Sequence, residues 1–206
     1  MSLWVIVPVK PLRRGKSRLA SVLSPEERAI LNQTMLANTL RVLQSVEEVD
    51  QVVVISRDSG VLGLARDFQA RTVQEDGRSQ LNAALQRATV VANMYGATSV
   101  LILPADLPLL SADTLRDFIS RARKPPCVVI APDRRRDGTN ALLLSPTGLF
   151  NYHYGIGSFR KHCELGEKAG ARVEIVYRQE LDLDLDLPED LEYLKQLEAS
   201  KAVNIL

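Results

Sequence analysis

The chain has 206 residues, of which 46% are hydrophobic, and its 26 basic and 25 acidic residues leave a net charge of +1. This size predicts a single domain over residues 1–206, and the balanced charge argues against nucleic acid or a membrane surface as a partner. Cys127 and Cys163 show no paired spacing, and no apolar run approaches the roughly 20 residues that cross a bilayer, so a cytoplasmic protein with a small-molecule partner is expected.

Short apolar runs alternate along the chain with amphipathic stretches of helical length. This alternation predicts an α/β fold of βαβ units, with a mostly parallel central sheet flanked by helices. The predicted strands are Leu3–Val9, Gln51–Ser56, Arg71–Gln74, Ser99–Leu103, Cys127–Ala131, Ala141–Ser145 and Arg172–Tyr177. The predicted helices cover about 24–45, 59–68, 79–95, 111–122, 158–169 and 188–199, and the first opens with a capping box of Ser24 and Glu27 around Pro25.

The first predicted strand runs directly into a basic loop, residues 10–19, with the sequence KPLRRGKSRL. In open α/β sheets, ligands bind beyond the carboxyl ends of strands, so this loop is placed to hold phosphate groups. Gly15 would free the backbone to turn amide groups toward an anion. A solvated loop that only aids solubility is the alternative. The five cations of the loop are Lys10, Arg13, Arg14, Lys16 and Arg18.

The fourth strand presents a carboxylate, Asp106, just beyond its carboxyl end. Mg²⁺ commonly binds one or two protein carboxylates together with the phosphate oxygens of a nucleotide, so a single aspartate here can begin a metal site. The alternative is an ordinary turn residue, because Asp106 lies between Pro104 and Pro108.

A second acidic feature is the segment LDLDLDLPEDL, in which leucines alternate with aspartates over residues 181–187. The alternation predicts an extended segment with its leucines on one face, and a half-buried strand with solvated aspartates is one reading. Aspartate is depleted in strands, however, and a shared cation would explain a same-face row of carboxylates. We therefore predict one magnesium site from Asp106, Asp184 and Asp186. The acids after Pro188 are expected to cap the last helix.

Two irregular segments could clamp a small phosphorylated acid. Thr139 and Asn140 follow a turn with three arginines, and Gly155 and Ser158 lie at the start of a helix, where amides and a hydroxyl can bind an anion. Ordinary turn glycines and an N-cap are the alternative, and capping is the expected main role of Ser158. No catalytic triad involves His153 or His162. Because an ionised phosphate needs no general base, positioning and charge neutralisation could suffice for its transfer.

Several motifs together resemble the guanylyltransferases of coenzyme F-420 biosynthesis over essentially the whole chain. They are VPVKPLRRGKSRL, QLNAAL, LPADLPLL, DGTNALLL, YGIGSF and DLDLPEDL, in that order. The resemblance implies the nucleotide-diphospho-sugar transferase fold, which is Rossmann-like. It also implies transfer of GMP from GTP to phosphoenolpyruvate, 2-phospho-L-lactate or 3-phosphoglycerate, with release of pyrophosphate.

The resemblance also implies roles for individual residues. GTP phosphates would be contacted by Lys10, Lys16 and Arg18. Magnesium would be held by Asp106, Asp184 and Asp186, and the acceptor by Thr139, Gly155 and Ser158. Leu81 and Asn82, with residues 74–77, would receive the base and ribose. Two features depart from relatives on this fold: the first loop is nearly free of glycine, and Leu187 stands where a hydroxyl-bearing cap is usual.

Two other functions remain open at this stage. Asp184 and Asp186 could form the DxD motif of a metal-dependent glycosyltransferase, although that motif usually lies nearer mid-chain. A non-catalytic nucleotide-binding subunit is the other alternative. The acceptor acid and the oligomeric state, for which a homodimer is the candidate, are not decided by the sequence.

Overall fold

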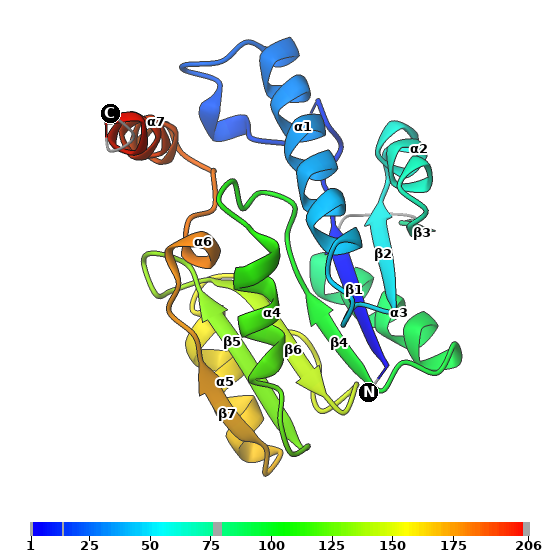
Figure 1. Cartoon of the computed structure of the whole chain (residues 1–206). Coiled ribbons are helices and arrows are strands. Elements are labelled where there is room, and N and C mark those ends of the chain that lie inside the picture. Colours follow the sequence, from blue (N-terminus) through cyan, green and yellow to red (C-terminus); the bar gives the residue numbers. More distant parts are fainter. Residues whose placement is uncertain (1, 14, 76–79, 204–206) are drawn as a thin grey trace.

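The computed structural model describes residues 2–13, 15–75 and 80–203, and the strands in these ranges join one mixed sheet (Figure 1). The order across the sheet is β3-β2-β1-β4-β6-β5-β7. Each predicted strand is present, with ends that move by at most two residues. The bounds are β1 (Leu3–Pro8), β2 (Gln51–Ser56), β3 (Arg71–Gln74), β4 (Ser99–Ile102), β5 (Cys127–Pro132), β6 (Thr139–Ser145) and β7 (Arg172–Ile175).

One strand, β6, runs antiparallel to both of its neighbours, whereas all other strand pairs are parallel. In its register Ile102 at the end of β4 faces Leu142 near the start of β6. The beginning of β6 therefore lies at the same edge of the sheet as the carboxyl ends of the parallel strands. This reversal brings Thr139 and Asn140 to the edge where α/β sheets bind ligands.

Helices cover both faces of the sheet (Figure 1). Leu36 and Leu40 of α1 pack with Leu3 and Val5 on one face, while Leu85 of α3 packs on the other. The alternating direction of side chains along β1 explains why a single strand supplies both cores. The helices are α1 (Pro25–Gln44), α2 (Ser59–Asp67), α3 (Leu81–Met94), α4 (Ala112–Ser120), α5 (Ser158–Lys168), α6 (Gln179–Asp182) and α7 (Pro188–Val203), with a 3₁₀ turn at Ser17–Leu19.

The predicted capping box at the start of α1 is confirmed. The hydroxyl of Ser24 accepts a hydrogen bond from the N–H of Glu27 at 3.2 Å, and the carboxylate of Glu27 accepts one from the N–H of Ser24 at 2.8 Å. None of the helices in the described ranges has the length and apolarity needed to cross a bilayer.

The extended segment predicted over residues 181–187 is wrong in its secondary structure. A short helix, α6, ends at Asp182, and irregular chain follows. The alternation of leucine and aspartate still predicts which side chains are buried, because Leu181, Leu183 and Leu185 are at most 1% exposed. The edge of β5 pairs with β7, so this segment does not pair with β5 as a strand. The N–H of Leu185 donates to the carbonyl of Asp106 at 3.0 Å. The leucines therefore anchor a loop, and no additional strand forms.

Candidate active site

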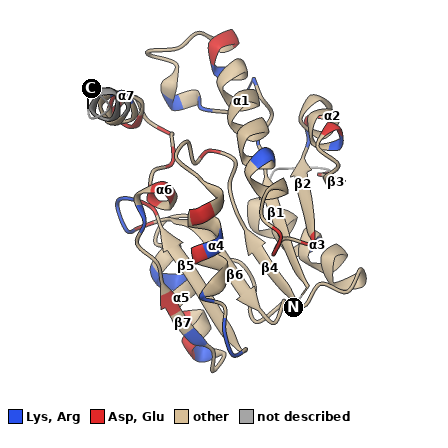
Figure 2. Ribbon diagram, in the orientation of Figure 1, with Lys and Arg blue, Asp and Glu red and all other residues tan. Residues whose placement is uncertain are grey.

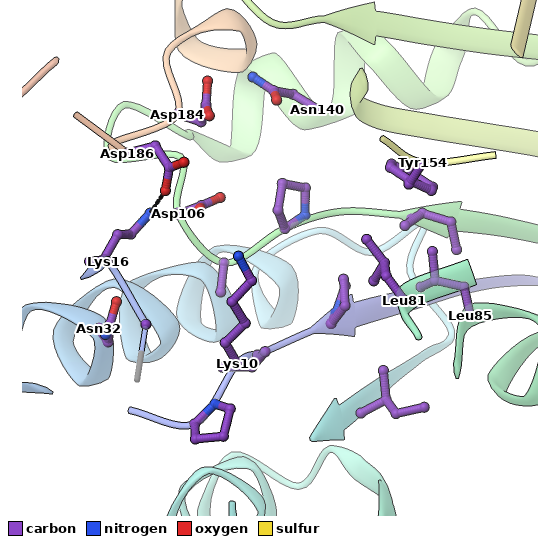
Figure 3. A pocket seen from close by; sticks show the side chains of 18 of the residues that line it. Lys10, Lys16, Asn32, Leu81, Leu85, Asp106, Asn140, Tyr154, Asp184 and Asp186 are labelled. Atoms are coloured by element: carbon purple, nitrogen blue, oxygen red, sulfur yellow. Dashed lines mark hydrogen bonds and ion pairs between the residues drawn. The ribbon is translucent and has the colours of Figure 1, made fainter. Parts of the chain in front are cut away.

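A cavity of about 300 Å³ opens at the carboxyl edge of β1, β2 and β4, bounded by the start of β6 (Figure 3). One end is charged, and the other is mainly apolar (Figure 3). The charged end is lined by Lys10, Lys16, Asp106, Asn140, Asp184 and Asp186, and the apolar end by Leu81 and Leu85. Ile55 of β2 and Glu75, directly after β3, also line the cavity. A cavity with these two ends suits a ligand that carries both phosphates and a ring.

The basic loop holds its shape through two unusual backbone positions. Lys16 adopts the left-handed conformation, with φ 56°. Gly15 permits a close approach, because a Cβ there would lie 2.7 Å from the side-chain nitrogen of Asn32. The N–H of Gly15 donates to the carbonyl of Pro11 at 2.8 Å. The N–H of Gly15 itself is therefore engaged within the loop, and the expectation that other amides of this loop turn toward an anion stays a prediction. Arg14 lies outside the described residues.

Lys16 lies between two carboxylates that come from distant parts of the chain. Its ammonium nitrogen is 2.6 Å from Asp106 Oδ2 and 3.7 Å from Asp186 Oδ1, and its side chain is only 5% exposed. The more exposed Arg18 contacts Asp186 at 3.1 Å. The loop after β1 thus meets the acids after β4 and after α6 (Figures 2 and 3). Lys10 is exposed and extends along the cavity, and no carboxylate of the described residues lies within 4 Å of its ammonium group.

Asp184 is the carboxylate of this cluster that no lysine or arginine of the described residues contacts within 4 Å. Burial, and then the negative charge of Asp106, raises the pKa of Asp184 from 3.8 to about 6, while a hydrogen bond with Asn140 acts in the opposite direction. Asn140 also donates to the carbonyls of Leu181 and Asp182 at 3.0 and 3.1 Å. Asn140 therefore holds the acidic segment in place at the cavity wall.

The carboxylates fit a nucleotide-borne Mg²⁺ better than a metal enclosed by protein. Among the described residues, no three His, Cys, Asp or Glu side chains are grouped closely enough to hold a metal ion. Mg²⁺ on a nucleotide needs only one or two protein carboxylates, because water and phosphate oxygens complete its shell. Asp184, which lies near Asp106 and lacks a cationic partner, has the chemistry for this role.

A second, more polar cavity of about 270 Å³ shares Asp184 and Asp186 with the first. Its other walls come mainly from the basic loop between β5 and β6 (Figure 2). Arg134 of this loop contacts Asp190 at 3.3 Å. Asp190 also accepts hydrogen bonds from the N–H groups of Asp186 and Leu187, which confirms the predicted capping role for Asp190, while that of Glu189 stays a prediction.

The predicted acceptor residues lie together, but not as an anion socket at a helix start. Thr139 lines the cavity, and the hydroxyl of Ser158 donates to Thr139 Oγ1 at 3.3 Å. The expected cap role of Ser158 is wrong, because Gly157 is the N-cap of α5. The N–H of Ser158 donates to the carbonyl of Gly155, and the next N–H donates to that of Asp137. The hydroxyl of Ser158 is thus engaged with Thr139, and the hydroxyl of Thr139 is the one at the cavity wall that is left for recognition.

Of the two residues predicted to contact the nucleoside, Leu81 lines the cavity and Asn82 does not. Leu81 lines the apolar end of the cavity. Asn82 instead joins α3 to the loop at Tyr154: its side chain accepts from the N–H of Tyr154 at 2.7 Å and donates to its carbonyl at 3.1 Å. Residues 76–79 lie outside the described ranges, so of the segment 74–77 only Gln74 and Glu75 can be placed.

Glu75 is a wall residue that the sequence analysis did not single out within that segment. Its side chain is 13% exposed and lies 3.6 Å from Arg57 Nε, beyond hydrogen-bond distance. Arg57 Nε and one terminal nitrogen are buried without a hydrogen-bond partner. Glu75 could have been found from the sequence, because it comes directly after β3, at the edge of the sheet where ligands bind. The Glu75 carboxylate at the cavity wall thus lies beside a guanidinium that has nitrogens without a hydrogen-bond partner.

The chain matches a known protein family over almost its whole length. Residues 3–202 match the family model described as "Guanylyl transferase CofC like". The chain belongs to this family. Phosphoenolpyruvate guanylyltransferase of Rubrobacter xylanophilus is 42% identical over 203 residues, which cover 98% of this chain and 97% of that protein. 2-phospho-L-lactate guanylyltransferase of Methanocaldococcus fervens is 34% identical, with 91% of this chain and 82% of that protein covered.

The fold of this CofC-like chain is also similar to solved structures. A candidate nucleotide-diphospho-sugar transferase of Desulfovibrio desulfuricans G20 superposes with a TM-score of 0.75 at 16% identity, covering 94% of this chain and 87% of that one. This similarity confirms the predicted nucleotide-diphospho-sugar transferase fold. The family membership makes the chain a guanylyltransferase and decides against a glycosyltransferase with a DxD motif.

Proposed function

We propose that this guanylyltransferase transfers GMP from GTP to phosphoenolpyruvate or 2-phospho-L-lactate and releases pyrophosphate, as a step in coenzyme F-420 biosynthesis. The names of its relatives support the two acceptors. The observation that carries the proposal is the two-ended cavity, in which Lys10 and Lys16 lie beside Asp106 and Asp184 while Leu81 lines the opposite end. The triphosphate belongs at the charged end, and the base belongs at the apolar end.

The cavity wall also offers groups that match guanine. The Watson–Crick edge of guanine carries two donors, N1–H and the 2-amino group, beside the O6 acceptor. A carboxylate can accept both donors at once, and Glu75 is the carboxylate of the cavity wall that follows β3, on the opposite side of β1 from β4 and Asp106 in the sheet order. We assign Glu75 to these donors and Leu81 to the face of the base.

In the proposed reaction, a phosphate oxygen of the acceptor attacks the α-phosphorus of GTP in line. A new P–O bond forms, the bond from the α-phosphorus to the bridging oxygen breaks, and pyrophosphate leaves with that oxygen. The attacking oxygen is already ionised at neutral pH, so the reaction needs no general base. Lys10, Lys16 and Arg18 offset the negative charge on the triphosphate, while Thr139, Gly155 and Ser158 position the acceptor.

We place Mg²⁺ against Asp106 and Asp184, with Asp186 completing the acidic set. When bound, Mg²⁺ would supply charge neutralisation for the phosphate oxygens. Asp186 would also keep Lys16 and Arg18 oriented, because both cations contact it. A cytoplasmic location and a homodimer stay predictions, which cell fractionation and sedimentation would check.

A pyrophosphate assay coupled to inorganic pyrophosphatase tests the proposal. The assay crosses the four nucleoside triphosphates with phosphoenolpyruvate, 2-phospho-L-lactate and 3-phosphoglycerate in the presence of Mg²⁺. We expect phosphate release with GTP and with phosphoenolpyruvate or 2-phospho-L-lactate, and almost none without an acceptor. Tight binding of GTP with no release from any acid would contradict the proposal and support the non-catalytic nucleotide-binding alternative.

A further inference from the structure

His162 lies next to the predicted acceptor residue Thr139, and its sequence context indicates no catalytic role for it. It belongs to α5 and is fully buried. Its ring is stacked with Phe150, with centroids 6.0 Å apart, and meets Tyr154 edge-on at 4.9 Å. A buried imidazole held from both sides has little freedom to rotate, so the direction of its hydrogen bonds is set.

The hydrogen bonds of the ring define which nitrogen carries the proton. The Nε2 atom accepts from the backbone N–H of His153 at 3.1 Å, so Nε2 has no hydrogen of its own. The Nδ1 atom lies 3.0 Å from Thr139 Oγ1. Burial, with a smaller contribution from His153, lowers the pKa of His162 to about 4, which keeps the ring neutral at pH 7. A neutral ring with a bare Nε2 carries its proton on Nδ1 and donates it to Thr139.

The hydroxyl oxygen of Thr139 then accepts two hydrogen bonds. Its oxygen receives the N–H of His162 and the hydroxyl hydrogen of Ser158, and a hydroxyl oxygen has two lone pairs. The remaining group is the hydrogen of Thr139 itself. Thr139 lines the cavity, so this hydrogen is available to an acceptor there. A carboxylate or phosphate oxygen is such an acceptor.

We propose that His162 is a positioning residue that commits the Thr139 hydroxyl to donate its hydrogen to the phosphorylated acid. This inference rests on the proposed function, because it deepens the role of the acceptor site. His162 acts only through Thr139 and touches no reacting atom. The donation would select against ligands that lack an oxyanion at this point.

Steady-state kinetics with three variants test the coupling between the two residues. His162→Phe keeps an aromatic ring but removes both hydrogen bonds, and Thr139→Val keeps the shape of threonine without its hydroxyl. We expect each to raise the KM for the acid about tenfold or more, while the KM for GTP stays within about twofold. The double variant should be no worse than Thr139→Val. His162→Asn, whose amide can still donate to Thr139, should recover part of the loss.

Two results would overturn the proposal in this experiment. If His162→Phe weakens acid binding as much in the Thr139→Val background as in the wild type, His162 does not act through Thr139. If both KM values rise together, the effect is a general disturbance of the site. Should the wild type release no pyrophosphate with any acid, the proposed function falls, and calorimetric binding of phosphoenolpyruvate to the wild type and Thr139→Val then replaces the kinetic comparison. Equal affinities there would refute the donor role.

A spectroscopic measurement tests the tautomer without any turnover. The chain has only two histidines, so protein labelled with ¹⁵N-histidine gives two imidazole spectra, and His153→Gln assigns them. We expect His162 to be neutral at pH 7, with a proton on Nδ1 and a bare Nε2. A proton on Nε2, or a charged ring, would overturn the proposal even if every variant at His162 and Thr139 failed to fold.

Discussion

The ammonium of Lys16 lies 2.6 Å from the carboxylate of Asp106, although 90 residues separate the two along the chain. The pairing of β1 with β4 accounts for this contact, because parallel neighbours release their following loops at the same edge of the sheet. Lys16 is nearly buried, so removing either partner leaves a charge with reduced hydration. The same pair therefore links the stability of the loop to the chemistry of the site.

Replacing Asp106 with asparagine tests the catalytic side of this pair. Asparagine keeps the size and a hydrogen-bond acceptor for Lys16 but removes the charge proposed for Mg²⁺. We expect pyrophosphate release from GTP and phosphoenolpyruvate to fall about 100-fold or more, while the circular dichroism spectrum stays that of the wild type. Full turnover in this variant would contradict the role assigned to Asp106.

The backbone of Lys16 gives a second prediction. Its φ of 56° is strained for any residue with a Cβ and unstrained for glycine. Lys16→Gly and Lys16→Ala both remove the amine, so both should lose most activity, but the glycine variant should be more stable by about 1 kcal/mol. Urea denaturation followed by fluorescence compares the two. Equal stabilities would mean that the loop leaves the left-handed conformation once the ion pair is gone.

The sequence predicted the features that depend on neighbouring residues. Strand positions followed from apolar runs, and the start of α1 followed from Ser24 and Glu27, because a capping box is complete within four positions. The burial of Leu183 and Leu185 also followed from their alternation with aspartates. Their secondary structure did not, since hydrogen bonds from distant residues such as Asp106 decide whether such a segment forms a strand.

In the candidate site too, some features could be predicted from the sequence and others depend on contacts between distant residues. The rule that ligands bind at the carboxyl edge of strands predicted its location, and the types of side chain predicted its chemistry. The partners of Gly15 and Ser158 could not be predicted, because Asn32 and Thr139 reach them only in the folded chain. His162 gave no local signal at all. Its importance comes from burial and from hydrogen bonds to residues 9 and 23 positions away.

Glu75 allows the nucleobase to be tested by a change in selectivity. Glu75→Gln replaces one carboxylate oxygen with an NH₂ group that opposes the donors of guanine. We expect kcat/KM for GTP to fall about tenfold or more. ITP lacks the 2-amino group, so the preference of the wild type for GTP over ITP should shrink toward unity in the variant. An unchanged ratio of GTP to ITP would show that another group reads the base.

His162 predicts how the stability of the protein depends on pH. Its pKa falls from 6.5 to about 4 on folding, so the unfolded chain takes up the proton more readily. The free energy of folding that neutral His162 contributes is fully present above pH 6.5 and is lost as the pH falls toward 4. The total loss is roughly 3 kcal/mol. His162→Phe cannot titrate, so the stability of the wild type relative to this variant should shrink by about that amount between pH 7 and pH 4 in urea denaturation. A constant difference would show that His162 takes up its proton as readily in the folded protein as in the unfolded chain.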